Sequence, residues 1–250
     1  MITRVQFQGV EYITDLSKPI DISIPLRGNS ENPSAWYLSP PEIAPVVMGD
    51  FVGSVASGAS TNFNTIVFNP HAHGTHTECI GHITEEFHAV GDSLKRYFFI
   101  CELITVQPIS YQGDLVITKD QLEVALQGKT PLAIVLRTKP NDPAKLTQQY
   151  SHTNPAYLLE EAALFMRQIG VKHLLIDLPS VDKEKDQGKL ASHKAFWDFD
   201  GNRRLDATIT EFIYVPDHIL DDTYFLNLQI ASFVNDASPS KPVLYQLLQP

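Results

Sequence analysis

The stretch HAHGTHTECIGHI, residues 71–83, holds four of the nine histidines of this 250-residue chain. One histidine alone is usually a solvated or core side chain, but four within twelve residues are unusual. If the segment is extended at His76 and Glu78, these side chains point to the same face, and His82 follows four residues later. Gly74 can adopt the positive φ that turns the flanking histidines towards one point. Imidazole and carboxylate ligands suit zinc or manganese, so the spacing indicates a transition-metal site.

The composition bounds the class of protein. With 43% apolar residues the chain can bury a large core, and we expect one domain over residues 1–250. The net charge of -10 and the scattered lysines and arginines favour no nucleic-acid partner and no anionic membrane surface. No window approaches eighteen continuous apolar residues, so we expect no membrane span. Two cysteines cannot form a disulfide framework and the N-terminus does not resemble a signal peptide, so we expect a cytoplasmic protein.

Strand and helix patterns alternate in the middle of the chain, which predicts a mixed α/β domain. The expected strands are ISIPL at 22–26, TIVF at 65–68, YFFICELITV at 97–106, PLAIVLRT at 131–138, HLLIDLP at 173–179 and FLNLQIASF at 225–233.

Two helices are predicted from their capping signals. The segment 118–127 begins at Thr118 as N-cap, has Gln121 three residues later and is followed by Gly128. The segment 154–169 begins with Asn154 and Pro155 and ends before Gly170.

Residues 27–64 are rich in Gly, Pro, Ser and Asn and carry few periodic signals. Such a long irregular segment in a compact domain is more often a functional lid or arm than slack, so we expect it to close over the site.

Other motifs are weaker. The sequence DFDGNRRLD at 198–206 has Arg203 where a calcium loop requires glycine, and we interpret it as an Asp-Gly turn. No GxSxG, HExxH, GxGxxG or phosphate-loop motif is present.

The histidine-rich stretch resembles the signature HxGTHxDxPxH of the cyclase family of metal-dependent hydrolases, which includes kynurenine formamidase. The matching positions are Gly74, Thr75, His76, Glu78 and His82.

Later segments match the family in the same order. DLPSVD at 177–182 is similar to the family's DxPSVD, and LASHKAFW at 190–197 to its downstream helix that carries a histidine. TITEF at 208–212 resembles the strand that bears a glutamate. Near the front, ISIPL and Trp36 lie where family members have a strand and a substrate-side tryptophan. The resemblance therefore runs through most of the chain.

Three departures from the signature bear on the site. Ala72 stands where the family has its first histidine, so the ligand is either His71, with one inserted residue, or His73 in a shifted role; we favour His71. Glu78 replaces an aspartate, which affects the number of metals or their bridging. Cys79 replaces an alanine, and we expect it to be a small buried packing residue.

The resemblance implies a single mixed β/α domain of the swivelling β/β/α type, which assembles as a homodimer or homotetramer. Because family members share pockets between subunits, it also implies that the segment at 27–64 closes onto a neighbouring subunit. It also implies hydrolysis of a small amide, ester or lactone, in the manner of an arylformamidase, with one or two Zn²⁺ or Mn²⁺ ions per chain. His82 would be the acid/base group and Trp36 a substrate-binding residue. The metal ligands would be His71, His76, Glu78, His193 and Glu211. The alternative is an inactive metal- or ligand-binding protein on the same scaffold, but a histidine beside the metal that does not bind it favours the enzyme.

Overall fold

The computed structural model describes residues 1–248, and its centre is a mixed sheet that closes on itself. The strands follow one another around the barrel in the order β16, β9, β12, β14, β15, β8 and β17, and β17 pairs back with β16. Their bounds are β16 Asp222–Ile230, β9 Phe98–Val106, β12 Ala133–Thr138, β14 His173–Ile176, β15 Thr208–Glu211, β8 His76–Glu78 and β17 Ala237–Gln246. The neighbours from β9 to β15 are parallel, and every other pair in the barrel is antiparallel.

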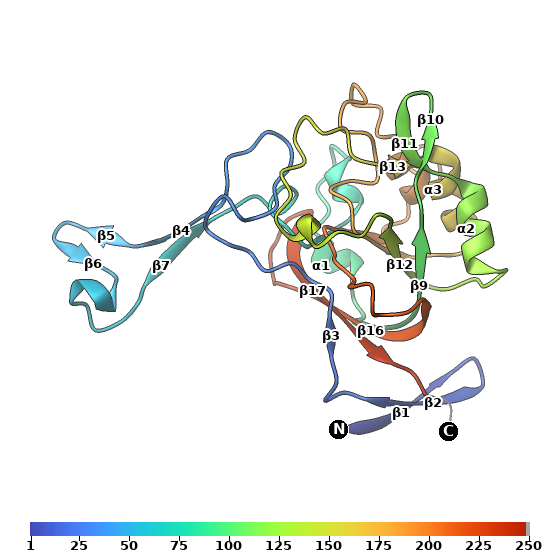
Figure 1. Cartoon of the computed structure of the whole chain (residues 1–250), viewed down its shortest axis with the longest axis horizontal. Helices are drawn as coiled ribbons and strands as arrows, with labels where there is room; N and C mark the ends of the chain where they lie inside the picture. Colours follow the sequence, from blue (N-terminus) through green and yellow to red (C-terminus); the bar gives the residue numbers. More distant parts are fainter. Residues whose placement is uncertain (249–250) are drawn as a thin grey trace.

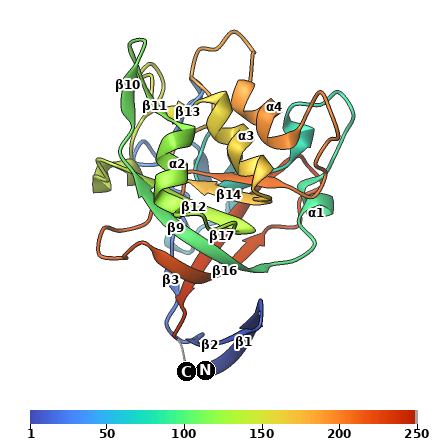
Figure 2. The same ribbon diagram turned by 90° about the vertical axis from the view of Figure 1, so that its right-hand side faces the viewer.

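Three helices cover one side of the parallel strands (Figure 2). They are α2 (Lys119–Leu126), α3 (Glu160–Gln168) and α4 (Ala191–Trp197). Along β12, Ile134 and Leu136 pack in the cluster beneath these helices, whereas Ala133 and Val135 pack in the opposite cluster. Because successive side chains of a strand point to opposite faces, both faces of β12 are buried. This accounts for the unbroken apolar run at 133–136.

An N-terminal hairpin lies at the end of the barrel opposite the helices (Figures 1 and 2). The hairpin of β1 (Ile2–Phe7) and β2 (Val10–Asp15) turns through Gln8 and Gly9, which both have positive φ, as the preferred hairpin turn requires. A single bridge joins Ile13 to Leu248. Beside it, β3 (Ile20–Asp21) pairs with β17.

A two-stranded arm extends away from the barrel (Figure 1, left). Its base is the antiparallel pair of β4 (Glu42–Pro45) and β7 (Asn64–Val67), and beyond it lie β5 (Val47–Met48), β6 (Phe51–Val52) and the 3-10 turn η1 (Val55–Ser57). The expected irregular lid at 27–64 is therefore partly regular. Its Gly- and Ser-rich part, residues 49–62, lies in this arm, which extends away from the barrel of its own chain. Closure of the segment onto a neighbouring subunit stays a prediction.

The remaining elements are short. They are η2 (Ile80–His82), α1 (Val90–Ser93), β10 (Ile109–Tyr111), β11 (Asp114–Ile117), η3 (Pro143–Leu146) and β13 (Tyr157–Leu158).

The predicted mixed α/β class is confirmed, and so is the first helix. Thr118 caps α2 in a full capping box with Gln121. The second helix begins later than predicted, at Glu160 instead of Asn154, because Tyr157–Leu158 pairs with β11 as a strand. It ends before Gly170, which has a φ of 89°.

Two of the predicted strands differ from the structure. In ISIPL at 22–26 only Ser23 makes a bridge, to Ile213, since the Ile24 N–H donates to Thr75 Oγ1 and Pro25 has no N–H. TIVF at 65–68 forms most of β7, which belongs to the arm and not to the barrel. No helix within residues 1–248 is long and apolar enough to cross a membrane.

Candidate metal centre

The pairing of β8 with β15 brings distant parts of the sequence together. In this antiparallel pair His76 lies opposite Glu211, and Glu78 lies opposite Ile209. His76 and Glu78 are two residues apart on one strand, so their side chains share a face. The side chains of His76, Glu78 and Glu211 are almost fully buried.

The loop before β8 is held by the backbone conformation of Gly74 and by the hydrogen bonds of the Thr75 side chain. Gly74 has a φ of 132°, a conformation that L side chains rarely adopt, and it places His71 beside the strand. Thr75 Oγ1 donates to the Phe212 carbonyl at 2.5 Å and accepts the Ile24 N–H at 2.7 Å. These bonds fix the start of β8 relative to the end of β15.

Glu78 is the centre of the cluster. Its Oε2 lies 3.0 Å from Nδ1 of His71, and its Oε1 lies 3.1 Å from Nε2 of His193. Nε2 of His76 and Nε2 of His82 each lie 3.9 Å from Oε2. The four histidine side chains thus surround one buried carboxylate.

His76 shows that the cluster suits a cation. Its Nδ1 is 3.0 Å from the Gly74 carbonyl, which can only accept, so Nδ1 carries a proton, and Nε2 of the neutral ring presents a lone pair. This Nε2 is buried without a hydrogen-bond partner and lies 3.5 Å from Oε2 of Glu211. A lone pair that faces carboxylate oxygens is unfavourable unless a cation lies between them. The donor set therefore fits a divalent metal.

His193 is positioned by a residue that the sequence prediction missed. Asp182 accepts hydrogen bonds from the backbone N–H groups of Ser192 and His193 at the start of α4, and its Oδ2 lies 2.6 Å from Nδ1 of His193. Nε2 of His193 is thereby directed at Glu78. Carboxylates behind metal-binding histidines commonly fix the ring in this way. Asp182 ends the DLPSVD motif, which was the available signal.

The pKa values reflect the concentration of charge. Burial opposes the charged form of His71, but Asp236 and Glu78 together raise its pKa to about 10. The pKa of His193 is raised well above its ordinary value against the effect of burial, because of Asp182 and Glu78. Burial works against ionisation of Glu78 too, yet the surrounding histidines lower its pKa. Without a metal, protons on these rings balance the carboxylates.

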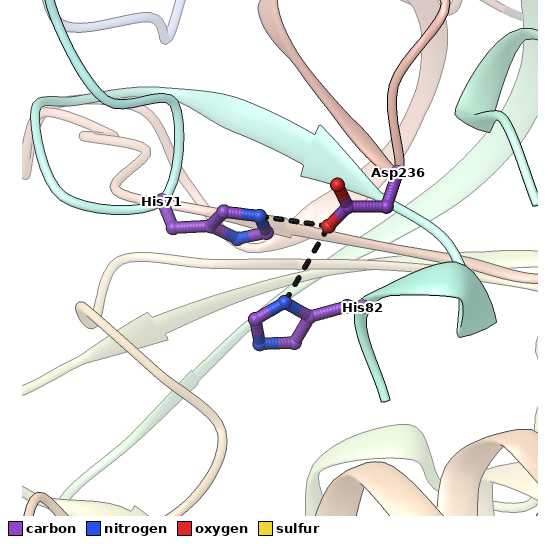
Figure 3. A group of neighbouring side chains, drawn as sticks. All are labelled: His71, His82 and Asp236. Carbon is purple, nitrogen blue, oxygen red and sulfur yellow. Dashed lines mark hydrogen bonds and ion pairs between the residues drawn. The ribbon is translucent and has the colours of Figure 1, made fainter. Parts of the chain in front are cut away.

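His82 and Asp236 lie beside His71 (Figure 3). His82 ends η2 and is about one third exposed, with Nδ1 3.5 Å from Oδ2 of Asp236. The same Oδ2 lies 2.9 Å from Nε2 of His71. Asp236 was not predicted, and its segment FVND carries no motif.

A cavity of about 320 Å³ opens on the cluster. It is lined by His71, His82, His193 and Glu211, and by the apolar side chains of Trp36, Leu38 and Leu190. Trp36 has a left-handed backbone, with a φ of 59°, and its Nε1–H donates to the His71 carbonyl at 3.1 Å.

All the residues predicted for the site except the alternative His73 thus gather at this cavity or directly beneath it. His73 Nδ1 accepts the Asn69 N–H at 2.9 Å, and the ring lines a different cavity. Cys79 is fully buried beside the cluster, as expected for a packing residue.

Comparisons with known proteins agree with this geometry. The sequence model of the family described as "Putative cyclase" matches residues 14–183, more than half of the chain. No protein of curated function matches the sequence.

Three solved structures share the fold at low sequence identity. A predicted metal-dependent hydrolase from Bacillus stearothermophilus is 19% identical, with a TM-score of 0.64 over 91% of this chain and 98% of that one. A potential metal-dependent hydrolase with cyclase activity is 17% identical, with a TM-score of 0.66 over 93% and 99%. An isatin hydrolase bound to the product analogue thioisatinate is 15% identical, with a TM-score of 0.67 over 93% of each chain. The family model matches more than half of the chain and the fold is shared, so the chain belongs to the cyclase family.

Proposed function

We propose that this protein is a metal-dependent hydrolase that cleaves the bond next to the carbonyl of a small amide, ester or lactone. The observation that carries the proposal is the buried Nε2 of His76, whose lone pair faces carboxylate oxygens of Glu211 and Glu78. Either a second proton on Nε2 or a metal ion satisfies this arrangement, and the histidine and carboxylate donors that converge there fit a metal ion.

Five side chains would hold the metal. We assign His71, His76, Glu78, His193 and Glu211 to one or two ions of Zn²⁺ or Mn²⁺. When bound, the metal supplies Lewis acidity, which lowers the pKa of a water molecule and polarises the substrate carbonyl.

The other residues act on the substrate directly. His82 lines the cavity outside this ligand set, where it can accept a proton from the attacking water and return it to the leaving group. Trp36, Leu38 and Leu190 form an apolar wall that excludes water and receives an aromatic or aliphatic part of the substrate. A cavity of about 320 Å³ limits the substrate to a small molecule.

The arm supports a proposal on assembly: it packs against a second copy of this chain in a homodimer, or in a homotetramer built from such dimers. An isolated two-stranded ribbon has little stability in water. Beyond Glu42 at the base of the arm, the only charged side chain between residues 43 and 67 is Asp50, so two arms can meet with little repulsion in a chain of net charge -10. Eight large apolar side chains of the arm are at least 37% exposed: Ile43, Val47, Met48, Phe51, Val55, Phe63, Ile66 and Val67.

We further propose one domain over residues 1–250 and a cytoplasmic location. One closed barrel with its covering helices forms the body. Both cysteines, Cys79 and Cys101, are buried free thiols, which suits a reducing compartment.

The function is tested with a panel of N-formyl aromatic amines, small aryl esters, lactones and isatin, with metal content measured on the same samples. We expect turnover of at least one member, loss of turnover after chelation, and recovery with Zn²⁺ or Mn²⁺. A folded protein that is loaded with metal and turns over no member would support the binding-protein alternative and contradict the proposal.

A further inference from the structure

Asp236 lies outside the residues matched by the family model, and none of the roles assigned above involves it. It occupies the last position before β17, and its backbone carbonyl accepts the Cys79 N–H at 3.0 Å. The next residue, Ala237, pairs with Glu78. The carboxylate of Asp236 is therefore held at a fixed place beside the metal centre by the pairing of β17 with β8.

The turn that carries His82 is packed closely against Asp236. A Cβ added at Gly81 would lie 2.3 Å from the His88 carbonyl oxygen and 3.2 Å from Cβ of Asp236. Only glycine fits there without a shift of the backbone. The chain thus brings His82 to Asp236 through a contact that no other residue at position 81 would allow.

One oxygen of Asp236 serves two imidazoles (Figure 3). Oδ2 lies 2.9 Å from Nε2 of His71 and 3.5 Å from Nδ1 of His82. The two rings are stacked, with centroids 4.2 Å apart and an interplanar angle of 27°, so both present a nitrogen to the same oxygen. An ionised carboxylate only accepts hydrogen bonds, so each facing nitrogen carries a proton.

The opposite nitrogens are then determined. Asp236 holds the proton on Nε2 of His71, so Nδ1, which faces Glu78 at 3.0 Å and shares a proton with it when no metal is bound, is the nitrogen that loses its proton to bind a metal. A proton on Nδ1 of His82 leaves Nε2 as the basic nitrogen, on the side of Glu78. His71 therefore directs its metal-binding nitrogen, and His82 its basic nitrogen, towards the metal centre.

We propose that Asp236 is a positioning residue that fixes the tautomers of the metal ligand His71 and the acid/base group His82 at once. This rests on the proposed function, because it takes the roles of both histidines from it. Asp182 provides a comparison within the same chain: it supports His193 in the same manner but does not contact His82. Asp236 couples metal binding to proton transfer, whereas Asp182 acts on metal binding alone.

The test uses the zinc-loaded full chain and the isosteric variant Asp236→Asn. We expect its zinc affinity, measured by competition with a chelator, to fall by about 10-fold to 100-fold because His71 loses its support. Nitrogen-15 NMR of the histidine rings should show His82 in the Nδ1–H form in the wild type and in a mixture of forms in the variant. The melting temperature of the zinc-loaded variant confirms that it is folded.

A double-mutant cycle tests the action through His82. At saturating zinc, Asp236→Asn should lower kcat in the wild-type background but cause no further loss in the His82→Ala background. Asp182→Asn is the matched control, and its effects on kcat should multiply with those of His82→Ala.

Three results would overturn the proposal. One is unchanged zinc affinity together with an unchanged His82 ring spectrum. Another is a multiplicative loss of kcat in the double variant. The third is a loss of one whole zinc equivalent per chain, which would make Asp236 a ligand of a second ion. The zinc and NMR measurements need no substrate, so failure of the proposed hydrolase function is distinguishable from failure of the role of Asp236.

Discussion

His76 and Glu211 face each other across the pair of β8 and β15, with Nε2 of His76 3.5 Å from Oε2 of Glu211. The histidine cannot turn away, because its other ring nitrogen is bonded to the Gly74 carbonyl. Strand pairing, rather than proximity in the sequence, therefore builds the site, and the two residues are held ready for a shared cation.

Replacement of His76 should empty the centre. In His76→Ala the metal content of the purified protein should fall strongly, since a buried ligand is lost. His73→Gln is the matched control, because His73 belongs to the same segment but lines a different cavity, and it should keep its metal. Elemental analysis of both variants measures this. Equal metal content in His76→Ala and the wild type would remove His76 from the ligand set.

Trp36 should act on substrate binding more than on chemistry. Trp36→Ala removes an aromatic wall of the cavity, so KM for aromatic substrates should rise by about 10-fold while kcat changes less. Trp36→Phe should retain most of the affinity. Steady-state kinetics on both variants checks this, and a fall in kcat with unchanged KM would argue that Trp36 has a different role.

The arm should hold two copies together. Val47→Asp or Phe63→Asp places a charge on an exposed apolar position of the arm and should shift the oligomer towards monomer. Val124→Asp is the control, because Val124 is 76% exposed on α2, away from the arm, and should leave the assembly unchanged. Light scattering after size-exclusion chromatography measures the mass. A wild-type monomer at working concentration would refute the assembly.

His173 should make the protein less stable at mildly acidic pH. Burial lowers its pKa to about 4, although Asp206 opposes this. Between the ordinary pKa of about 6.5 and the folded value, the unfolded chain binds a proton that the folded chain does not. The free energy of unfolding therefore falls as the pH drops through this window.

The size of this effect follows from linkage. From pH 7 to pH 5 the metal-free wild type should lose about 1 to 2 kcal/mol more than metal-free His173→Gln. Urea denaturation at both pH values measures the difference, and because the metal centre is the same in both proteins, its own titration cancels. Parallel pH profiles would show that His173 is not held neutral by burial.

Much of the site could be predicted because the histidine-rich stretch and the motifs around His193 and Glu211 carry local signals. The barrel strands β9, β12 and β14 were visible as apolar runs because both of their faces are buried. Asp236 could not be found, since its role depends on the pairing of β17 with β8, which no local pattern encodes.

The errors in the fold have a related cause. ISIPL has strand composition, but its backbone bonds are divided: Ile22 donates to Pro242, Ser23 makes one bridge to Ile213, and Ile24 donates to the Thr75 side chain. Asn154 and Pro155 resemble a helix start, yet the pairing of Tyr157–Leu158 with β11 delays α3. The small residues at 27–64 indicated a lid or an arm without showing the direction in which the segment extends.

Replacement of His82 tests the central claim most directly, because the account places His82 beside the metal but outside its ligands. In His82→Ala the metal content should equal that of the wild type, while turnover of any accepted amide, ester or lactone should fall by about 10² to 10⁴. Metal analysis and rate are measured on the same samples, and the melting temperature confirms the fold. If metal and activity are instead lost in step, His82 is a ligand and the proposed division of roles is contradicted.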